Sequence, residues 1–188
     1  PRSTPKPSSA ASDVYKRQLL ESLDEPTAHQ YQSYQGIPEL RKAISSFYNT
    51  HYNVKLNSDE QILPLIGSKE GIMHISMAFL NPGDKVLIPN PGYPTYSSVT
   101  KLLDAEPIPY ELDESKGWLP ELEKLDKSDM SKVKLMWLNY PHMPTGSEAN
   151  DEFYKKIILF AKKNNVLFGN FTQIFVPPPF FPVTIEMN

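Results

Sequence analysis

The sequence predicts an α/β fold with three layers, in which a mostly parallel sheet carries helices on both faces. Apolar segments of strand length lie at KVLIP (85–89), EPIPYEL (106–112) and VKLMWL (133–138), and VLF (166–168) begins a fourth. Segments with helical periodicity separate most of them. Strands that alternate with helices of this length are typical of a parallel sheet that is buried on both sides.

Four segments have the apolar spacing or the end signals of helices. They cover GIPELRKAISSFYNTHY (36–52), SKEGIMHISMAFL (68–80), the residues after the turn NPGYP (90–94) and NDEFYKKIILFAKKNN (150–165). The sequence NPGD at 81–84 ends the second of them. In the last, we expect Phe153, Ile157, Phe160 and Ala161 to face inward, because they share one side of the helix.

The composition excludes several classes of protein. The chain has 188 residues, of which 39% are apolar and 22% charged, as in folded globular proteins. A net charge of −3 gives no electrostatic basis for binding nucleic acid or an anionic membrane. There are no cysteines, which excludes disulfides and thiolate metal sites. The longest apolar runs are too short to span a bilayer, so we expect a cytoplasmic protein.

The two ends of the chain differ from its middle. Residues 1–18, which include SSAASDVYKRQ, resemble translated cloning or sequencing-adapter DNA, and we predict a non-native or disordered segment there. Residues 19–168 are predicted to fold. Residues 169–188 contain VPPPFFP (176–182), which cannot form a helix or a central strand. We predict an aberrant end after Phe168; the alternative is a proline-rich extended tail.

The segment LPLIGSKEGI (63–72) contains the first candidate binding site. An apolar stretch ends at Gly67, and a helix begins with Ser68 and Lys69. Free backbone N–H groups and the positive end of the helix dipole make such a start a site for an anion, and a phosphate fits it best. On this tripeptide alone, a capped helix with an exposed lysine is the more common arrangement, since neither a Walker A loop nor GxGxxG is present.

Aromatic residues gather in two further segments. PNPGYPTYSSV (89–99) follows a predicted strand, and Tyr93 there could stack on a planar ligand or pack in the turn, with equal support. We expect Tyr96 to be a packing residue, in the core or in the turn. HQYQSYQGIPELR (29–41) presents Tyr31 and Tyr34 to a ligand, to another subunit or to solvent.

Histidines give no sign of a metal site or of nucleophilic catalysis. His29, His51, His74 and His142 lack metal-ligand spacing, and no nucleophile-elbow signature is present. We expect His74, inside a helix among apolar residues, to be a hydrogen-bonded packing residue. His142 lies in NYPHMPTG (139–146), a turn at the end of a predicted strand, where α/β proteins bind ligands.

Four segments occur in an order that resembles a known family. They are YQSYQGIPELRKAI, ILPLIGSKEGI, FLNPGDKVLIPNPGYPTY and NYPHMPTG. In this order they resemble the class I/II aminotransferases of pyridoxal-phosphate fold type I, and most of all the LL-diaminopimelate aminotransferase branch. The likeness covers residues 25–168, part of the large domain. It implies a pyridoxal 5′-phosphate cofactor, transfer of an amino group between an amino acid and a 2-oxo acid, and a homodimer.

The resemblance also implies roles for individual residues. Gly67, Ser68 and Lys69 match the helix start that receives the cofactor phosphate. Tyr93 matches the aromatic ring that stacks on the pyridine, and Tyr31 matches the tyrosine that reaches the phosphate of the neighbouring subunit.

Several positions depart from the family pattern. Met143 replaces the asparagine of NPTG, which hydrogen-bonds the cofactor's 3′-oxygen, and a thioether cannot donate. We expect His142 to replace that donor if the turn rotates. Phe168 falls at the position of the aspartate that pairs with the pyridine nitrogen, and Phe171 at that of a tyrosine.

The family's Schiff-base lysine has no match in this sequence. Lys162 and Lys163 lie on the polar side of a predicted helix, where we expect solvated surface residues. No catalytic residue is therefore assigned, and the 188-residue chain is expected to be inactive by itself.

Two other functions stay open. One is a degenerate aminotransferase-like binding module without catalysis, and the other is a pyridoxal-phosphate-dependent lyase or decarboxylase of the same superfamily. The branch resemblance favours diaminopimelate as the amino donor, but methionine, aromatic, alanine and aspartate donors all stay open.

Overall fold

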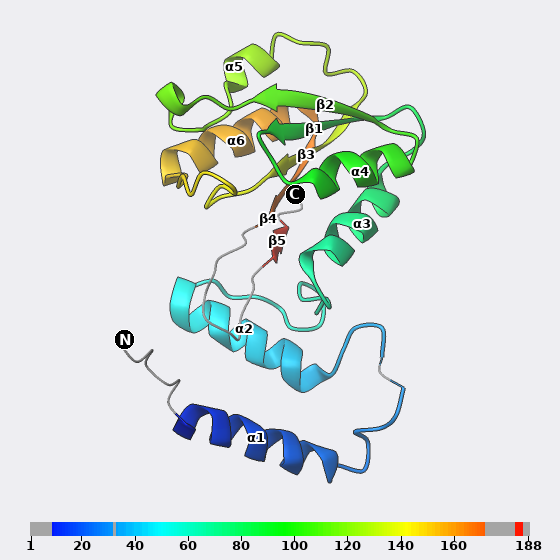
Figure 1. Cartoon of the computed structure of the whole chain (residues 1–188). Coiled ribbons are helices and arrows are strands. Elements are labelled where there is room, and N and C mark those ends of the chain that lie inside the picture. Colours follow the sequence, from blue (N-terminus) through cyan, green and yellow to red (C-terminus); the bar gives the residue numbers. More distant parts are fainter. Residues whose placement is uncertain (1–8, 32, 172–182, 186–188) are drawn as a thin grey trace, which may run out of the picture. The chain divides into compact units, whose positions relative to one another are not determined.

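A computed structural model of the chain describes residues 9–31, 33–171 and 183–185 (Figure 1). The chain divides into two compact units, one through Pro64 and one from Leu65, and each is described by itself. Most of the residues from VPPPFFP onward lie outside the described part. Among the described residues, no helix is long and apolar enough to cross a membrane.

The first unit contains two helices, α1 (Ser9–Leu23) and α2 (Pro38–Tyr52). Residues 9–18 thus lie in a helix, although we predicted a non-native or disordered segment at 1–18. That residues 1–18 are foreign to the protein stays a prediction. Helix α2 begins with Pro38, which lacks a backbone N–H at a position where that group would have no acceptor within the helix. Its C-cap residue, Asn53, is in the left-handed region (φ 55°).

The second unit is built on a five-stranded sheet. Its strands are β1 (Lys85–Asn90), β2 (Glu106–Glu111), β3 (Val133–Leu138), β4 (Leu167–Phe171) and β5 (Val183–Ile185). Their order is β2-β1-β3-β4-β5; the first four are parallel, and β5 pairs antiparallel with β4. The predicted mostly parallel sheet is confirmed. Strand β4 continues to Phe171, beyond the boundary predicted at Phe168.

Helices cover both faces of this sheet (Figure 1). They are α3 (Ser68–Phe79) and α4 (Pro94–Leu102) on one face, and α5 (Leu122–Leu125) and α6 (Asp151–Asn164) on the other; a short 3₁₀ turn, η1, spans Glu114–Lys116. Strand residues alternate between the two cores: Leu87 and Met136 contribute to the α6 side, and Val86 and Trp137 to the α3–α4 side. The three-layer prediction is therefore confirmed.

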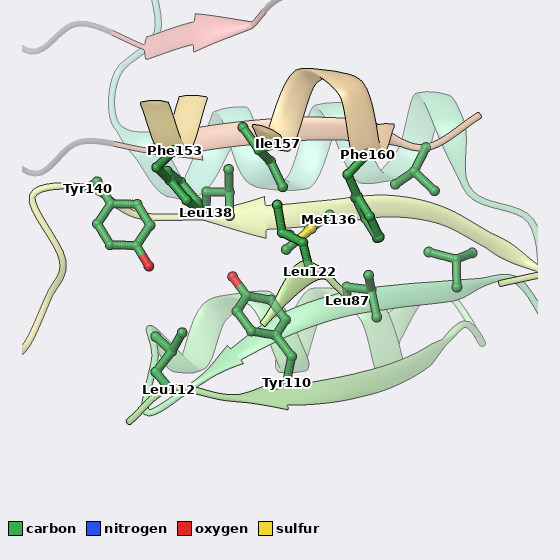
Figure 2. Packing of buried hydrophobic residues seen from close by; sticks show 12 residues of the cluster. Leu87, Tyr110, Leu112, Leu122, Met136, Leu138, Tyr140, Phe153, Ile157 and Phe160 are labelled. Carbon is green, nitrogen blue, oxygen red and sulfur yellow. The ribbon is translucent and has the colours of Figure 1, made fainter. Parts of the chain in front are cut away.

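Helix α6 closes one face with the residues that the sequence predicts. Phe153, Ile157, Phe160 and Ala161 are buried, and Figure 2 shows the first three pointing toward Met136 and Leu138 of β3. Burying each such large side chain stabilises the fold by about 1.5–3 kcal/mol. The helix starts at the Asn150 side chain, which accepts the N–H of Phe153 at 2.9 Å.

The opposite face is held by an aromatic stack. Tyr96 of α4 is 1% exposed, and its ring stacks on Trp137 of β3 with centroids 5.4 Å apart and an interplanar angle of 12°. The prediction that Tyr96 is a packing residue is confirmed. Gly169 of β4 lies under the indole, and a Cβ on it would come within 2.4 Å of the Trp137 Cζ3. Only glycine therefore fits at this position.

Replacing this glycine tests how tightly the aromatic stack is packed. We expect Gly169→Ala to lower the free energy of unfolding by about 1–3 kcal/mol, since the buried indole cannot move aside without leaving Tyr96. Urea denaturation of this variant and of the wild type measures the difference; equal stabilities would show that the indole is free to shift.

Candidate functional site

The candidate site lies where strands of the second unit end. Strand β1 leads through residues 90–93 into α4, and β3 leads into the turn at 139–147. Because β1 and β3 are parallel neighbours, their carboxyl ends meet at the same edge of the sheet. Two of the segments that the sequence analysis singled out therefore come together there.

Helix α3 begins at the predicted anion site. Gly67 is the N-cap residue, in extended conformation, and Ser68 and Lys69 form the first turn. Their backbone N–H groups have no acceptor within the helix, and the positive end of its dipole adds to them. No described atom lies within 4 Å of a Cβ built on Gly67, so the space beside this turn is open. An anion can approach the backbone closely here.

Glu70 fixes the shape of this turn. Its Oε2 accepts the N–H of Ile66 at 2.7 Å, and its Oε1 lies 3.4 Å from the Nε2 of His74. The carboxylate is thus directed back toward the residue before the helix. We predicted His74 to be a hydrogen-bonded packing residue: it does have a polar partner in Glu70, but the packing part is wrong. Its side chain is 60% exposed, because the buried side of α3 carries Ile72 and Ser76.

Tyr93 lies beside the first turn of α3. The Nζ of Lys69 is 5.9 Å from the centroid of the Tyr93 ring, within the range of a cation–π contact. The half-buried ring also meets Tyr96 edge-on, at 5.9 Å and 86°. A Cβ on Gly92 would lie 2.3 Å from the Pro89 carbonyl oxygen, so only glycine permits this tight turn. The family resemblance led us to expect the cation and the aromatic ring at one site, and the structure places them side by side.

Short hydrogen bonds close the turn after β3. The Asn139 side-chain oxygen accepts the N–H of Met143 at 2.7 Å, and His142 exchanges backbone bonds with Gly146 (2.6 Å) and Ser147 (2.7 Å). Gly146 has a φ of +75°, which favours glycine. Met143 is half-buried, and its thioether has no hydrogen to donate.

His142 is buried in this turn, with 2% of its surface exposed. Its Nε2 lies 3.2 Å from the carbonyl oxygen of Pro91, and its Nδ1 lies 2.8 Å from the Thr145 hydroxyl. Burial lowers the pKa of His142, whereas the bond to Pro91 raises it by a smaller amount. For His142 to act instead as the donor that Met143 lacks, one of these two bonds would have to break.

The remaining predicted residues belong to other segments of the chain. Tyr31 and Tyr34 belong to the first unit, where both side chains are fully exposed. Phe168 is half-buried against the apolar cluster under α6, and the side chain of Phe171 lies outside the described part. Lys162 and Lys163 are exposed, as predicted; Lys163 pairs with Asp126.

Sequence reasoning missed Asn139 and Asn170. Each ends or follows an apolar strand, and the Oδ1 of Asn170 accepts the N–H of Tyr140 at 3.0 Å. Ligands bind at the carboxyl ends of parallel strands, so the positions of these two amides in the sequence could have marked them as candidate site residues. Their partners could not be foreseen, because each depends on how two separate segments meet.

Comparison with known proteins identifies the family. The family model described as aminotransferase class I and II matches residues 5–168. The chain belongs to the class I and II aminotransferases. The matched range begins inside the segment 1–18 that the sequence analysis set aside. The recognition made from four short motifs is confirmed.

Individual aminotransferases give the same result. An LL-diaminopimelate aminotransferase of Dehalococcoides mccartyi (strain CBDB1) is 42% identical over 149 residues, which are 79% of this chain and 38% of that protein. The transaminase BacF of Bacillus subtilis is 41% identical over 148 residues, 79% of this chain and 37% of BacF. This aminotransferase chain thus spans about two fifths of the length of the curated relatives it matches.

Solved structures agree on the fold. Substrate-bound BacF superposes with a TM-score of 0.80 at 38% identity, covering 89% of this chain and 41% of that one. An aminotransferase from Staphylococcus aureus has a TM-score of 0.79 at 31% identity, covering 89% and 43%. The predicted fold, part of a fold-type I aminotransferase, is confirmed.

The buried histidine predicts a pH dependence of stability. Because the pKa of His142 is lower in the folded chain than in the unfolded chain, unfolding takes up a proton once the pH falls below about 6.5. This group should therefore cost no stability above that pH and reduce it progressively below. We expect the free energy of unfolding of the wild type to fall more between pH 7.5 and 5.5 than that of His142→Gln. Parallel losses in urea denaturation would contradict this.

Proposed function

We propose that this chain is part of a pyridoxal 5′-phosphate-dependent aminotransferase that moves an amino group between an amino acid and a 2-oxo acid. One observation carries the proposal: the Gly67-Ser68-Lys69 helix start lies beside the Tyr93 ring, with Lys69 Nζ 5.9 Å from its centroid. A phosphate at the helix and an aromatic heterocycle against the ring are the two halves of one ligand. The residues present fit this group.

Each of these residues has a distinct task toward the ligand. Ser68 and the first-turn amides would hold the phosphate, and Lys69 would neutralise part of its charge. Tyr93 would cover one side of the pyridine and exclude water from it. When bound, pyridoxal phosphate supplies a ring that takes up the electron pair left after a bond to the amino acid's Cα breaks.

Further properties of the whole protein belong to the same proposal. The amino donor is an amino acid such as diaminopimelate, because an LL-diaminopimelate aminotransferase is among the relatives, at 42% sequence identity. The protein acts in the cytoplasm as a homodimer. Tyr31, fully exposed on its loop, would reach the phosphate bound by the neighbouring subunit. No described lysine is assigned to covalent bonding of the cofactor.

A binding module without catalysis is the second candidate. The Met143 side chain has no hydrogen to donate to the cofactor, and Phe168 packs against the apolar cluster. By the family resemblance, these two positions would carry an asparagine that hydrogen-bonds the 3′-oxygen and an aspartate that pairs with the pyridine nitrogen. This chain has neither group at those positions. A chain of this kind would still bind the phosphate and the ring, but it would not turn over an amino acid.

Binding of the phosphate can be tested apart from any covalent chemistry. Pyridoxine 5′-phosphate has no aldehyde, so we expect it to raise the melting temperature while pyridoxine does not. Lys69→Ala should weaken binding by roughly three- to tenfold, since one charged contact is lost. Lys101→Ala, an exposed lysine of α4, is the control. Equal affinities of the two variants for pyridoxine 5′-phosphate, measured by calorimetry, would remove Lys69 from the site.

Stacking can be tested on the aromatic ring itself. Tyr93→Phe keeps the ring and loses only the hydroxyl, whereas Tyr93→Leu keeps apolar bulk without a π-face. We expect the phenylalanine variant to bind pyridoxine 5′-phosphate nearly as well as the wild type. The leucine variant should lose about 0.5–1.5 kcal/mol of binding free energy. Inorganic phosphate should bind all three proteins alike; a loss of phosphate affinity would place the Tyr93 effect in the fold instead of in stacking.

A further inference from the structure

We propose that His142 is a positioning residue, which joins the turn after β3 to the turn after β1 and thereby fixes the place of the Tyr93 ring. The contact between the two turns is direct: the His142 Nε2 lies 3.2 Å from the Pro91 carbonyl oxygen. The residues are 51 positions apart in the sequence. This proposal rests on the proposed function in one respect: the Tyr93 ring stacks on the cofactor.

The partners of the imidazole determine its tautomer. A carbonyl oxygen can only accept a hydrogen bond, so the Nε2 must carry the hydrogen that Pro91 receives. The Nδ1 of the neutral ring is then an acceptor, and the Thr145 hydroxyl at 2.8 Å donates to it. Thr145 is in the same turn, so it orients the ring from the side opposite Pro91.

Aromatic neighbours hold the ring in the plane that this bond requires. Trp118 lies nearly parallel to His142, with centroids 6.5 Å apart and an angle of 18°, and Tyr140 lies 5.8 Å away at 38°. Tyr140 is itself anchored, since its hydroxyl donates to the Trp118 carbonyl at 2.6 Å. With 2% exposure, the imidazole has little access to water that could replace Pro91.

The position of the turn after β1, which His142 contacts at Pro91, determines the position of Tyr93. Asn90 is fixed at the end of β1, where its carbonyl oxygen accepts the N–H of Leu112 at 2.8 Å. Gly92 packs so closely on Pro89 that the turn has little room to change shape. Tyr93, two residues after Pro91, is the N-cap residue of α4. A shift of the Pro91 carbonyl therefore moves the Tyr93 backbone and, with it, the ring beside Lys69.

Two substitutions separate the two hydrogen bonds of the ring. A glutamine amide reaches about as far as the Nε2 and can donate to Pro91, whereas an asparagine amide reaches only as far as the Nδ1. His142→Gln therefore keeps the tether, and His142→Asn keeps only the Thr145 side. Both replacements are neutral amides, so they differ in reach and not in charge.

The first measurement needs no ligand. Long-range ¹H–¹⁵N spectra of the wild type at pH 7.5 should show His142 as the neutral Nε2–H tautomer. The ring signals of Tyr93 in ¹H–¹³C spectra should then shift in His142→Asn and stay near the wild type in His142→Gln. An Nδ1–H tautomer, or equal Tyr93 shifts in both variants, would overturn the proposal even if pyridoxine 5′-phosphate fails to bind any of the proteins.

The second measurement uses two probes. We expect His142→Asn to weaken pyridoxine 5′-phosphate binding by about three- to tenfold and His142→Gln to retain most of the affinity. Inorganic phosphate, which needs only the start of α3, should bind both variants like the wild type. If the asparagine variant does not fold, Thr145→Val tests the orientation of the ring, with a smaller Tyr93 shift expected. Equal losses for both probes would mean that His142 supports the fold and does not position Tyr93.

Discussion

The parallel pairing of β1 with β3 is the constraint on which the candidate site depends. Parallel strands end at the same edge, so the turn carrying Tyr93 and the turn carrying His142 must meet there. Such a sheet is stable only when both faces are buried, which the clusters under α6 and around Trp137 accomplish. The apolar packing far from the site thus places its polar groups.

Much of this architecture could be predicted from the sequence. Apolar runs bounded by turn residues located β1, β2 and β3, and the one-sided apolar pattern of α6 gave its buried face. The anion-binding start of α3 followed from three residues, because the chemistry of a helix end depends only on local backbone. These features are local, so pattern and propensity determine them.

Contacts between distant segments could not be predicted in this way. The sequence could not indicate that His142 binds the Pro91 carbonyl, since that bond joins two turns through the register of the sheet. His74 was misjudged for a related reason: its neighbours in sequence are apolar, but the helix rotates it to the exposed side. The proximity of Lys69 to Tyr93, by contrast, was expected from the family resemblance, although neither segment alone indicates it.

In the first unit, Arg41 has a consequence for how that part of the chain behaves. The side chain is 6% exposed, and it donates to the carbonyl oxygens of Gly36 (2.7 Å) and Ser58 (2.9 Å) and to the carboxylate of Asp59 (3.2 Å). One guanidinium on α2 thereby hydrogen-bonds to the segment before the helix and to the segment after it. A lysine has no planar fork with which to do so. Loss of this one cation would therefore release the backbone at Gly36, before α2, together with the segment at Ser58 and Asp59 that follows the helix.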